Sequence, residues 1–534
     1  MTKLITSIIG LFFFGTMTSA QLTKFSHGDI LSAGSMNKNF DYLIERIETR
    51  KITINCPNDN ITDALKEYNH IMISGKCSEN LLLSADVIPH RFIILEGVTG
   101  PSNDGIVALD SSSSVIAAWM GIKIKVKNLT LSGGKHGVYI AAGGFALLES
   151  SKIENMSDHG IYSAGAISVC SNSIIENIEK HSAFNLNGSI GHIEKCQLSG
   201  NSSSDTVRFE IGSSGEILDS TINGGKGGLL IDKASSVLIG KSKPVTISGA
   251  ETGITVSGNS NLEIRNTTVK NISLNGITAK QNSSVFLRGN NTFTQITNNA
   301  FDIYINSTLS NEGELNLSNP IKISGNSFIY LNNAKISADG DSLLMISLGS
   351  SGKISNSNLS GNLTSKILGL WNGSSLEIQN SILESTGWSD GINISSHSSL
   401  QLFSTSIKTK DNTVYLTDNS HIQIRSNSKL VSSERVALDI NRGSGARIDS
   451  GTSIQSTGHI AIRLRENSWL KIKKSNKDNP TIINRTDAGN DIELSDLSSI
   501  SIDDGNTIGT VVCTGKSFAS VSEGTVGLLG DDCK

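Results

Sequence analysis

Three histidines recur at a nearly constant interval in the first half of the chain, and their side chains could transfer protons. They are His136, His159 and His181, and Asp205 follows them after almost the same interval. An imidazole can act as a general acid or base near neutral pH. If the interval is a structural repeat, these side chains lie in one column on successive turns of the chain.

Carboxylates and an arginine accompany the histidines. Glu154 and Glu176 are separated by the same interval, and stacking two carboxylates would raise the pKa of one of them. Beside the histidines, a further column is expected from Lys135, Asp158 and Lys180. These spacings define the candidate catalytic residues, which are His159, Glu176, His136, His181, Glu154 and Arg208. A polar corner that simply recurs in every repeat produces the same columns, so a purely structural role stays open.

Aromatic side chains are the candidates for substrate binding. Tyr139 and Tyr162 alternate with apolar neighbours, and this alternation turns both side chains outward from a strand. Trp371, Trp388 and Trp469 could offer surfaces to sugar rings, although a single tryptophan more often packs, and the first two are the candidates for sugar contact. Three histidines in a line do not form the tetrahedral set that zinc prefers, so the sequence predicts no metal ligands.

The element that must position these residues is a repeat of about 24 residues. Each copy starts with a short segment in which apolar and polar residues alternate, such as Ile254-Thr255-Val256. A turn rich in Gly, Asn and Ser follows, then a second alternating segment and a third short apolar segment. Such runs are typical of short, half-buried strands, and three strands per unit form one coil of a parallel β-helix. The predicted fold class is therefore all-β, with coils stacked about 4.8 Å apart. Asparagine and serine at matching corners are expected to stack and hydrogen-bond in ladders, as with Asn259, Asn282 and Asn372.

The repeat divides the chain into predicted regions. These are a signal peptide over residues 1–20, an N-terminal segment with a short helix over 21–50, the β-helix over 51–510 and a C-terminal cap over 511–534. A short helix over 61–68 is expected to cap the first coil. The repeat is weakest at 306–330 and 473–490, where loop insertions are expected.

Six cysteines indicate an oxidising compartment. Spacing alone leaves several pairings open, and pairing of neighbours would join Cys56 to Cys77, Cys170 to Cys196, and Cys513 to Cys533. After the predicted signal peptide, no apolar run is long enough to span a membrane. The sequence therefore predicts a secreted or cell-surface protein without a membrane span in its mature form.

The composition excludes one class of partner. The formal net charge is −4, with 45 Lys and Arg against 49 Asp and Glu, which gives no electrostatic case for nucleic-acid binding. A late basic group could instead bind an anionic glycan, and it comprises Arg442, Arg447, Arg463, Arg465, Lys471, Lys473 and Lys474.

The coil pattern and the predicted capping helix resemble the pectate-lyase-like family of right-handed parallel β-helix proteins, over about residues 51–510. That family includes pectate lyases, polygalacturonases, epimerases, phage tailspikes and exported proteins without known activity. Its members that cleave polygalacturonides carry Asn-Thr-Asp, Asp-Asp, Gly-His-Gly and Arg-Ile-Lys motifs. The chain lacks that set of motifs. It contains the pair Asp503-Asp504, but the other motifs of the set do not accompany this pair. The resemblance therefore implies the fold and leaves the activity open.

A second resemblance concerns the N-terminal segment. Gly28 to Ala33 and Asn37 to Phe40 are similar to segments near the N-termini of exported bacterial surface and fibre-like proteins. In fibre-like relatives an apolar stripe such as Phe40, Leu43 and Ile47 leads into a trimeric coiled coil, so a homotrimer is one hypothesis. The alternative is an amphipathic helix docked on the first coil.

Two functions follow from these observations. The first is an exported, adhesin-type β-helix that binds a polysaccharide or cell-surface glycan without catalysis. The alternative is a polysaccharide lyase, hydrolase or epimerase that acts on an outer face of the early coils. No cofactor is expected, apart from calcium if the protein is a lyase.

Overall fold

The computed structural model describes residues 50–84, 86–474, 480–485, 490–522, 526–529 and 532–533. The chain divides into two units, Met1–Arg50 and Lys51–Lys534. The predicted signal peptide, the N-terminal segment with its helix, and the apolar stripe lie outside the described residues.

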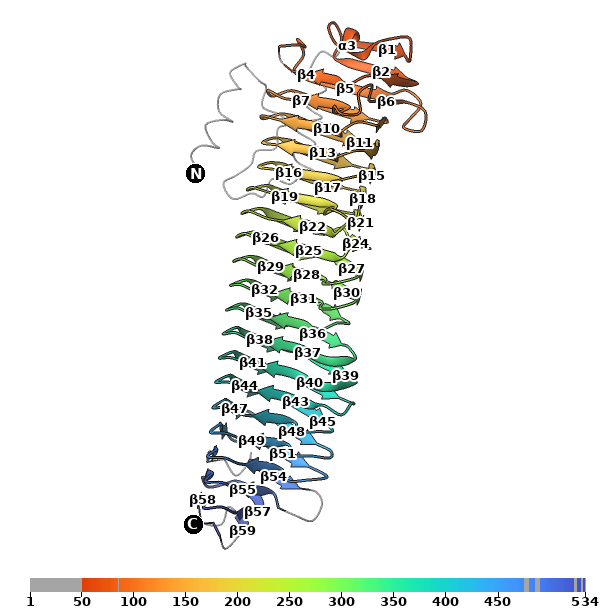
Figure 1. Ribbon diagram of the computed structural model, residues 1–534. Helices are drawn as coiled ribbons and strands as arrows, with labels where there is room; N and C mark the ends of the chain where they lie inside the picture. The colour runs from red at the N-terminus through yellow and green to blue at the C-terminus, as the bar shows by residue number, and fades with distance from the viewer. Residues whose placement is uncertain are drawn as a thin grey trace, which may run out of the picture. The chain divides into compact units, whose positions relative to one another are not determined.

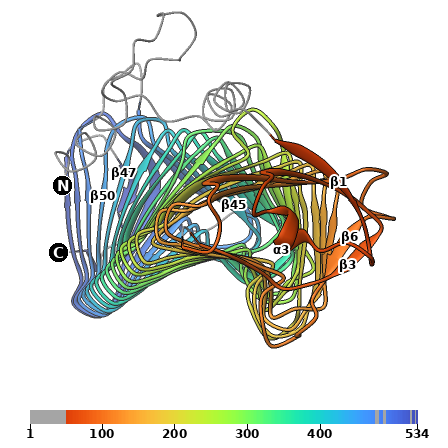
Figure 2. The same ribbon diagram turned by 90° about the horizontal axis from the view of Figure 1, so that it is seen from above.

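The second unit is a parallel β-helix in which each coil contributes three strands (Figure 1). One coil consists of β25 (Thr252–Val256), β26 (Asn261–Arg265) and β27 (Thr267–Ile272). Each strand pairs in parallel with its equivalent one coil later, which is β28 (Ile277–Ala279), β29 (Ser284–Arg288) or β30 (Asn291–Ile296). The described residues form about 18 such coils, which overlie one another when seen from above (Figure 2). The predicted β-helix is confirmed.

The core lies inside the coils and consists of apolar side chains that alternate with outward polar ones. Ile254, Ile264 and Ile277 are fully buried, whereas Thr255 and Glu263 are only partly covered. One coil cannot bury its own apolar face, because the neighbouring coils supply the contacts. The fold therefore places outward side chains of successive coils in columns.

Asparagines occupy tight corners, as predicted. Asn259 and Asn282 both adopt left-handed backbone conformations, with φ values of 61°, and Asn372 does the same with a φ of 55°. Asparagine tolerates this conformation better than most residues. The Asn282 amide Nδ2 donates to Asn259 Oδ1 at 3.2 Å, which forms one rung of a ladder between coils.

A second ladder, which we call the serine ladder, confirms the expectation that serines at matching corners hydrogen-bond from coil to coil. The Ser213 amide N–H donates to Ser235 Oγ at 3.1 Å, and the Ser235 N–H donates to Ser260 Oγ at 3.2 Å. The Ser235 hydroxyl in turn donates to the Asp232 carbonyl at 2.7 Å. The same amide-to-hydroxyl bond links further pairs, including Ser189 to Ser213, Ser283 to Ser307, Ser307 to Ser327, Ser327 to Ser350, Ser374 to Ser398, Ser398 to Ser420 and Ser420 to Ser444.

A short helix, α3 (Ile61–Ala64), lies where the sequence predicted one over 61–68. The Asn60 side chain accepts from the Asp63 N–H at 2.9 Å, and Glu79 Oε1 accepts from the Ile61 N–H at 2.6 Å. These carboxylate and amide oxygens satisfy donors that a helix start leaves unpaired. Its role as a cap of the first coil stays a prediction.

One of the two predicted loop insertions, the one at 306–330, is wrong. Over 306–330 the chain forms a shortened coil, because the step from Ile303 to its partner Ile323 is shorter than the preceding step from Ala279 to Ile303. At 473–490 the coil is longer, since Arg463 pairs with Glu493 although Asp439 pairs with Arg463 in the coil before. The solenoid also continues beyond residue 510, through β57 (Thr507–Cys513).

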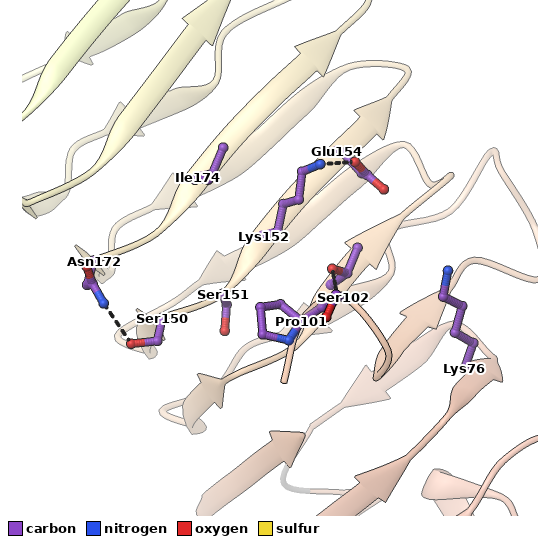
Figure 3. Close-up of a pocket in the computed structure, with 10 residues that line it drawn as sticks. Lys76, Pro101, Ser102, Ser150, Ser151, Lys152, Glu154, Asn172 and Ile174 are labelled. Atoms are coloured by element: carbon purple, nitrogen blue, oxygen red, sulfur yellow. Dashed lines mark hydrogen bonds and ion pairs between the residues drawn. The ribbon is translucent and has the colours of Figure 1, made fainter. Parts of the chain in front are cut away.

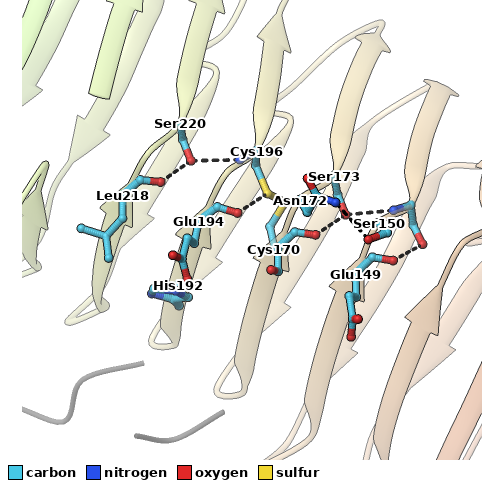
Figure 4. The surroundings of a disulfide bond; sticks show 12 residues. Glu149, Ser150, Cys170, Asn172, Ser173, His192, Glu194, Cys196, Leu218 and Ser220 are labelled. Atoms are coloured by element: carbon cyan, nitrogen blue, oxygen red, sulfur yellow. Dashed lines mark hydrogen bonds and ion pairs between the residues drawn. A yellow bond between two sulfur atoms is a disulfide. The ribbon is translucent and has the colours of Figure 1, made fainter. Parts of the chain in front are cut away.

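All three predicted disulfides are confirmed. They join Cys56 to Cys77, Cys170 to Cys196 and Cys513 to Cys533, with Cα–Cα distances of 4.9, 6.5 and 5.0 Å. Cys170 lies close to Cys196 of the next coil inside the solenoid, next to Ser173 and Ser220 (Figure 4). The Cys196 N–H donates to Ser220 Oγ at 3.0 Å.

Candidate functional site

The strands β10 (His136–Ala141) and β13 (His159–Ala164) position the first group of candidate residues. They pair in parallel with His136 opposite His159 and Tyr139 opposite Tyr162. Val138 and Ile161 are buried in the core, whereas Tyr139 and Tyr162 are partly exposed on the outer side. The two histidines are buried at the start of the strands, and their rings contact those of the tyrosines.

The glycine after each histidine is required by close packing. A Cβ on Gly137 would lie 2.7 Å from the Gly160 carbonyl oxygen, and one on Gly160 would overlap the Ala183 carbonyl oxygen. Any larger residue would displace the neighbouring coil. Glycine is therefore the residue that fits after both histidines.

The rings of His136, His159, His181, Tyr139 and Tyr162 form a continuous stack, which we call the imidazole–tyrosine stack. Ring centroids of His136 and His159 are 5.3 Å apart, and those of His159 and His181 are 5.1 Å apart. The Tyr139 and Tyr162 rings are 5.6 Å apart with an interplanar angle of 10°. Because the rings cover one another's faces, they offer mainly edges to a ligand.

The Asp158 carboxylate faces all three imidazoles. Its oxygens lie 3.9 Å from His136 Nε2, 3.6 Å from His159 Nε2 and 3.3 Å from His181 Nε2. His159 Nδ1 accepts from the Ser182 N–H at 3.2 Å, which places the proton of the neutral ring on Nε2, towards Asp158. The sequence assigned Asp158 to a neighbouring column and did not reveal this convergence.

Burial keeps two of these imidazoles neutral. It lowers the pKa of His136 to about 4, and it also lowers the pKa of His159 to about 4, against the smaller opposing effect of Asp158. Both residues are more than nine-tenths buried. At neutral pH their ring edges are therefore uncharged donors and acceptors.

His181 is displaced from the predicted column by a single position. Met156 pairs with Ile178 and Ile161 pairs with Phe184, so the corner between these pairs is longer by a single residue in the second coil. The strand register, continued to this corner, places Ser182 opposite His159. The His181 side chain is 50% exposed, and its ring still reaches the stack. Lys180, which was expected in line with Asp158, is exposed.

The column of tyrosines continues into polar residues. In β16 (Phe184–Asn187) and β19 (Val207–Glu210), Asn185 follows Tyr162, and Arg208 follows Asn185. The Arg208 guanidinium contacts Glu210 at 3.0 Å and Asp205 at 3.9 Å. Burial raises the pKa of Asp205, and the nearby Arg208 opposes that shift.

Glu154 and Glu176 lie in a different environment from the imidazoles. They are opposite each other in β12 (Lys152–Met156) and β15 (Ile174–Ile178), as their spacing predicts. Lys152 Nζ bridges them at 2.5 and 2.9 Å, and these contacts raise the pKa of the lysine. Within the described part of the chain, neither carboxylate has a recorded hydrogen bond or ion pair with the imidazole–tyrosine stack.

A hollow of about 430 Å³ borders this lysine–carboxylate group (Figure 3). Lys152 and Glu154 line it together with Lys76, Pro101 and Ser102. It lies on the strands β12 and β15 and does not include the stacked rings. The candidate catalytic residues therefore separate into two groups.

The two candidate tryptophans lie many coils away. Trp371 follows β40 (Leu363–Leu370), and its ring occupies the space where Gly369 lacks a side chain, with Lys366 Nζ 5.1 Å from the ring centroid. Trp388 is 57% exposed in the turn before β43 (Asp390–Ile394). Neither belongs to one site with Tyr139 and Tyr162.

No set of three or more His, Cys, Asp or Glu side chains suited to holding a metal occurs among the residues that the structure describes. In the same part of the chain, no helix has the length and apolar character needed to cross a membrane.

Comparisons with known proteins identify the fold. The family model for the right-handed β-helix region matches residues 104–250, 169–311 and 252–428. The catalytic domain of a GH87 alpha-1,3-glucanase in complex with nigerose is 14% identical, with a TM-score of 0.35, over 64% of this chain and 66% of that one. The A-module of the Azotobacter vinelandii mannuronan C-5 epimerase AlgE6 is 10% identical, with a TM-score of 0.21, over 78% and 95%. No match was found among the curated proteins.

Proposed function

Because the chain belongs to the family of right-handed β-helix proteins, we propose that it is an exported, adhesin-type member that binds a polysaccharide or cell-surface glycan. The observation that carries this proposal is the imidazole–tyrosine stack with its row of outward polar edges. Three disulfides between neighbouring coils are consistent with export to an oxidising compartment.

The stack supplies what recognition of sugar hydroxyls needs. Tyr139 and Tyr162 contribute hydroxyl groups, and the rings that carry them are held in place by stacking. Asn185, which is 5% exposed, has a side-chain oxygen without a hydrogen-bond partner among the described residues. That oxygen is covered by its neighbours, so the Tyr139 and Tyr162 hydroxyls are the groups that the column offers to a ligand. Rigid polar groups at the coil spacing would contact successive parts of an extended glycan.

The same geometry favours binding over cleavage. An imidazole with a pKa of about 4 is a weak general base at neutral pH, and this applies to His136 and His159. Glu154 and Glu176 are engaged by Lys152 beside a separate hollow. Of the three imidazoles, only His181, which is half-exposed beside Asp158, is left as a group that could act as an acid or a base.

The binding proposal is tested by removing the hydroxyls and keeping the rings. The double variant Tyr139→Phe/Tyr162→Phe preserves the stack, so each lost hydrogen bond should weaken glycan binding by about 2- to 10-fold. Binding is measured by isothermal titration with the polysaccharide that gives the strongest signal in a pull-down panel. Tyr330→Phe, in β35 (Phe328–Asn332) of the other sheet, is the matched control and should bind normally.

The alternative of a polysaccharide lyase, hydrolase or epimerase predicts a different result. Incubation of the same panel, with and without calcium, would release reducing ends or unsaturated uronides, or would change uronate configuration. His181 would then be the first residue to replace, since its half-exposed ring lies 3.3 Å from Asp158. Turnover lost in His181→Ala with binding retained would replace the binding proposal by an enzymatic one.

A further inference from the structure

The structure separates the late basic residues into groups with different surroundings. Arg463 and Arg465 both contact the buried Asp439 carboxylate, at 2.5 and 3.2 Å, on the larger sheet. Arg442 lies at a corner between two carboxylates, and Lys474 pairs with Asp504 at 3.6 Å. The remaining residues of the group lie on the smaller sheet or directly after one of its strands, and they are Arg447, Lys471 and Lys473.

An exposed tryptophan accompanies these remaining cations. In β47 (His421–Arg425), β50 (Gly445–Ile448) and β53 (Trp469–Ile472), the register aligns His421, Gly445 and Trp469. Trp469 is 41% exposed, and its indole occupies the space where Gly445 lacks a side chain. It stacks on His421 from two coils away, with ring centroids 5.4 Å apart. The backing imidazole holds the indole in a fixed position.

Carboxylates neutralise only part of the positive charge next to this indole. Arg447 and Lys471 are opposite each other on adjacent coils. Like charges in that position destabilise a sheet. Asp449 contacts Arg447 at 3.0 Å and Arg425 at 3.1 Å, so one carboxylate serves two guanidinium groups. Lys471 is exposed and has no ion pair with any described residue.

We propose that His421, Trp469, Arg447 and Lys471, the Trp469 patch, bind an anionic polysaccharide that carries uronate or sulfate groups. The indole would pack against a pyranose ring, and the two cations would contact the acidic substituents of that ring and of its neighbour. Phe518, which lies two coils beyond Trp469 in the same column, is 54% exposed and extends the apolar surface.

The occupant is argued from charge and shape. The chain carries a net charge of −4, so general attraction to polyanions such as nucleic acid is absent and binding must be local. One indole and one phenyl ring two coils apart on a sheet give little continuous apolar surface to insert into a lipid bilayer. A sugar ring with an acidic group matches one indole beside two cations. This patch lies on a different sheet from the imidazole–tyrosine stack, and its existence does not depend on that site.

Affinity electrophoresis of the full protein in gels that contain polygalacturonate, alginate or dextran sulfate tests the proposal, with neutral dextran as the control polymer. The wild type should be retarded by at least one of the anionic polymers, and high salt should abolish the retardation. Lys471→Gln should weaken binding by about 3- to 10-fold, and Trp469→Ala by about tenfold or more.

Lys335→Gln, in β36 (Ala334–Ser337), is the matched control, because it removes the same charge from an exposed lysine of the other sheet. Equal retardation of Lys471→Gln and Lys335→Gln would overturn the proposal, as would no retardation by any of the three anionic polymers. Binding of the patch to DNA or to phosphatidylserine vesicles instead of these polymers would also overturn it. Tyr139→Phe/Tyr162→Phe should leave this retardation unchanged, so failure here is distinguishable from failure at the first site.

Discussion

His136 and His159 show how the environment of a residue changes its chemistry. An exposed histidine titrates near pH 6.5, but burial between coils lowers the pKa of both imidazoles to about 4. Asp158 offsets part of this effect without reversing it, because the rings lose more hydration than one carboxylate at 3.6 to 3.9 Å replaces. In the folded protein, both imidazoles are therefore uncharged at neutral pH.

These shifts predict a loss of stability in acid. Between pH 6.5 and 4 the unfolded chain binds protons at His136 and His159 that the folded chain does not, so the free energy of unfolding decreases as the pH falls through this window. This loss is absent above pH 6.5, is complete below about pH 4, and is on the order of 3 kcal/mol per imidazole. Urea unfolding followed by circular dichroism at pH 4.5 and pH 7.5 measures it. The double variant His136→Gln/His159→Gln should depend less on pH, and an unchanged dependence would contradict the assignment.

At the scale of one coil, the serine ladder joins each corner to the next. The Ser235 hydroxyl accepts a hydrogen bond from the Ser213 N–H of the preceding coil and donates one to the Asp232 carbonyl of its own coil. Ser235 is fully buried. Buried backbone donors need a partner, and the hydroxyl supplies one where no strand pairing is available. This requirement explains why serine recurs at that corner in coil after coil.

Ser235→Ala should therefore destabilise its coil. The substitution leaves the Ser213 N–H and the Asp232 carbonyl without their partners, at a loss of about 1–3 kcal/mol. Hydrogen exchange of the amides around residues 213 and 235 should accelerate while distant coils stay protected. Ser202→Ala, at an exposed position, is the control and should change nothing measurable. Equal exchange in both variants would show that the ladder contributes no stability.

The same scale shows what sequence alone could and could not predict. The regular interval predicts the coil, its inward residues and the pairing of His136 with His159, because a period of two within a constant repeat leaves little freedom. It does not predict His181, since a single extra residue at a corner moves a side chain out of register without disturbing the strands. Weak similarity at 306–330 suggested an insertion, whereas the coil there is short.

The sequence interval also could not predict contacts between side chains of different columns. The interval aligns Glu154 with Glu176, but it does not place Lys152 between them. Likewise, the late basic residues are close in sequence, but they lie on successive strands of a coil, and these strands face different sides of the solenoid. Only the structure shows that Arg463 belongs with Asp439 and that Lys471 belongs with Trp469.

For the unit Lys51–Lys534 as a whole, each coil contacts mainly its neighbours, so damage stays local. The disulfide Cys513–Cys533 links the last described strands, which among the described residues have a neighbouring coil on one side only. A cross-link over a loop of about 20 residues contributes about 3 kcal/mol in the chain-entropy account.

Replacing both cysteines in Cys513→Ser/Cys533→Ser should loosen the last coils and leave the early ones intact. Limited proteolysis with mass spectrometry should find new cuts after β55 (Ile492–Leu494), while strands β10 to β19 stay resistant. In contrast, Cys170→Ser/Cys196→Ser removes a link between coils that have neighbours on both sides, and it should cause less cleavage. New cuts spread over the whole solenoid would show that it unfolds as one unit.

The two terminal disulfides, Cys56–Cys77 and Cys513–Cys533, have a consequence for mechanical load. A pull on a chain end would peel hydrogen bonds from one coil at a time, and each detached coil of about 24 residues would release up to about 80 Å of extended chain. A covalent bond that closes the outermost coil prevents that coil from straightening. The force then passes to the first coil boundary beyond the bond, so the unit resists small tensions at its ends and lengthens in steps once they are exceeded.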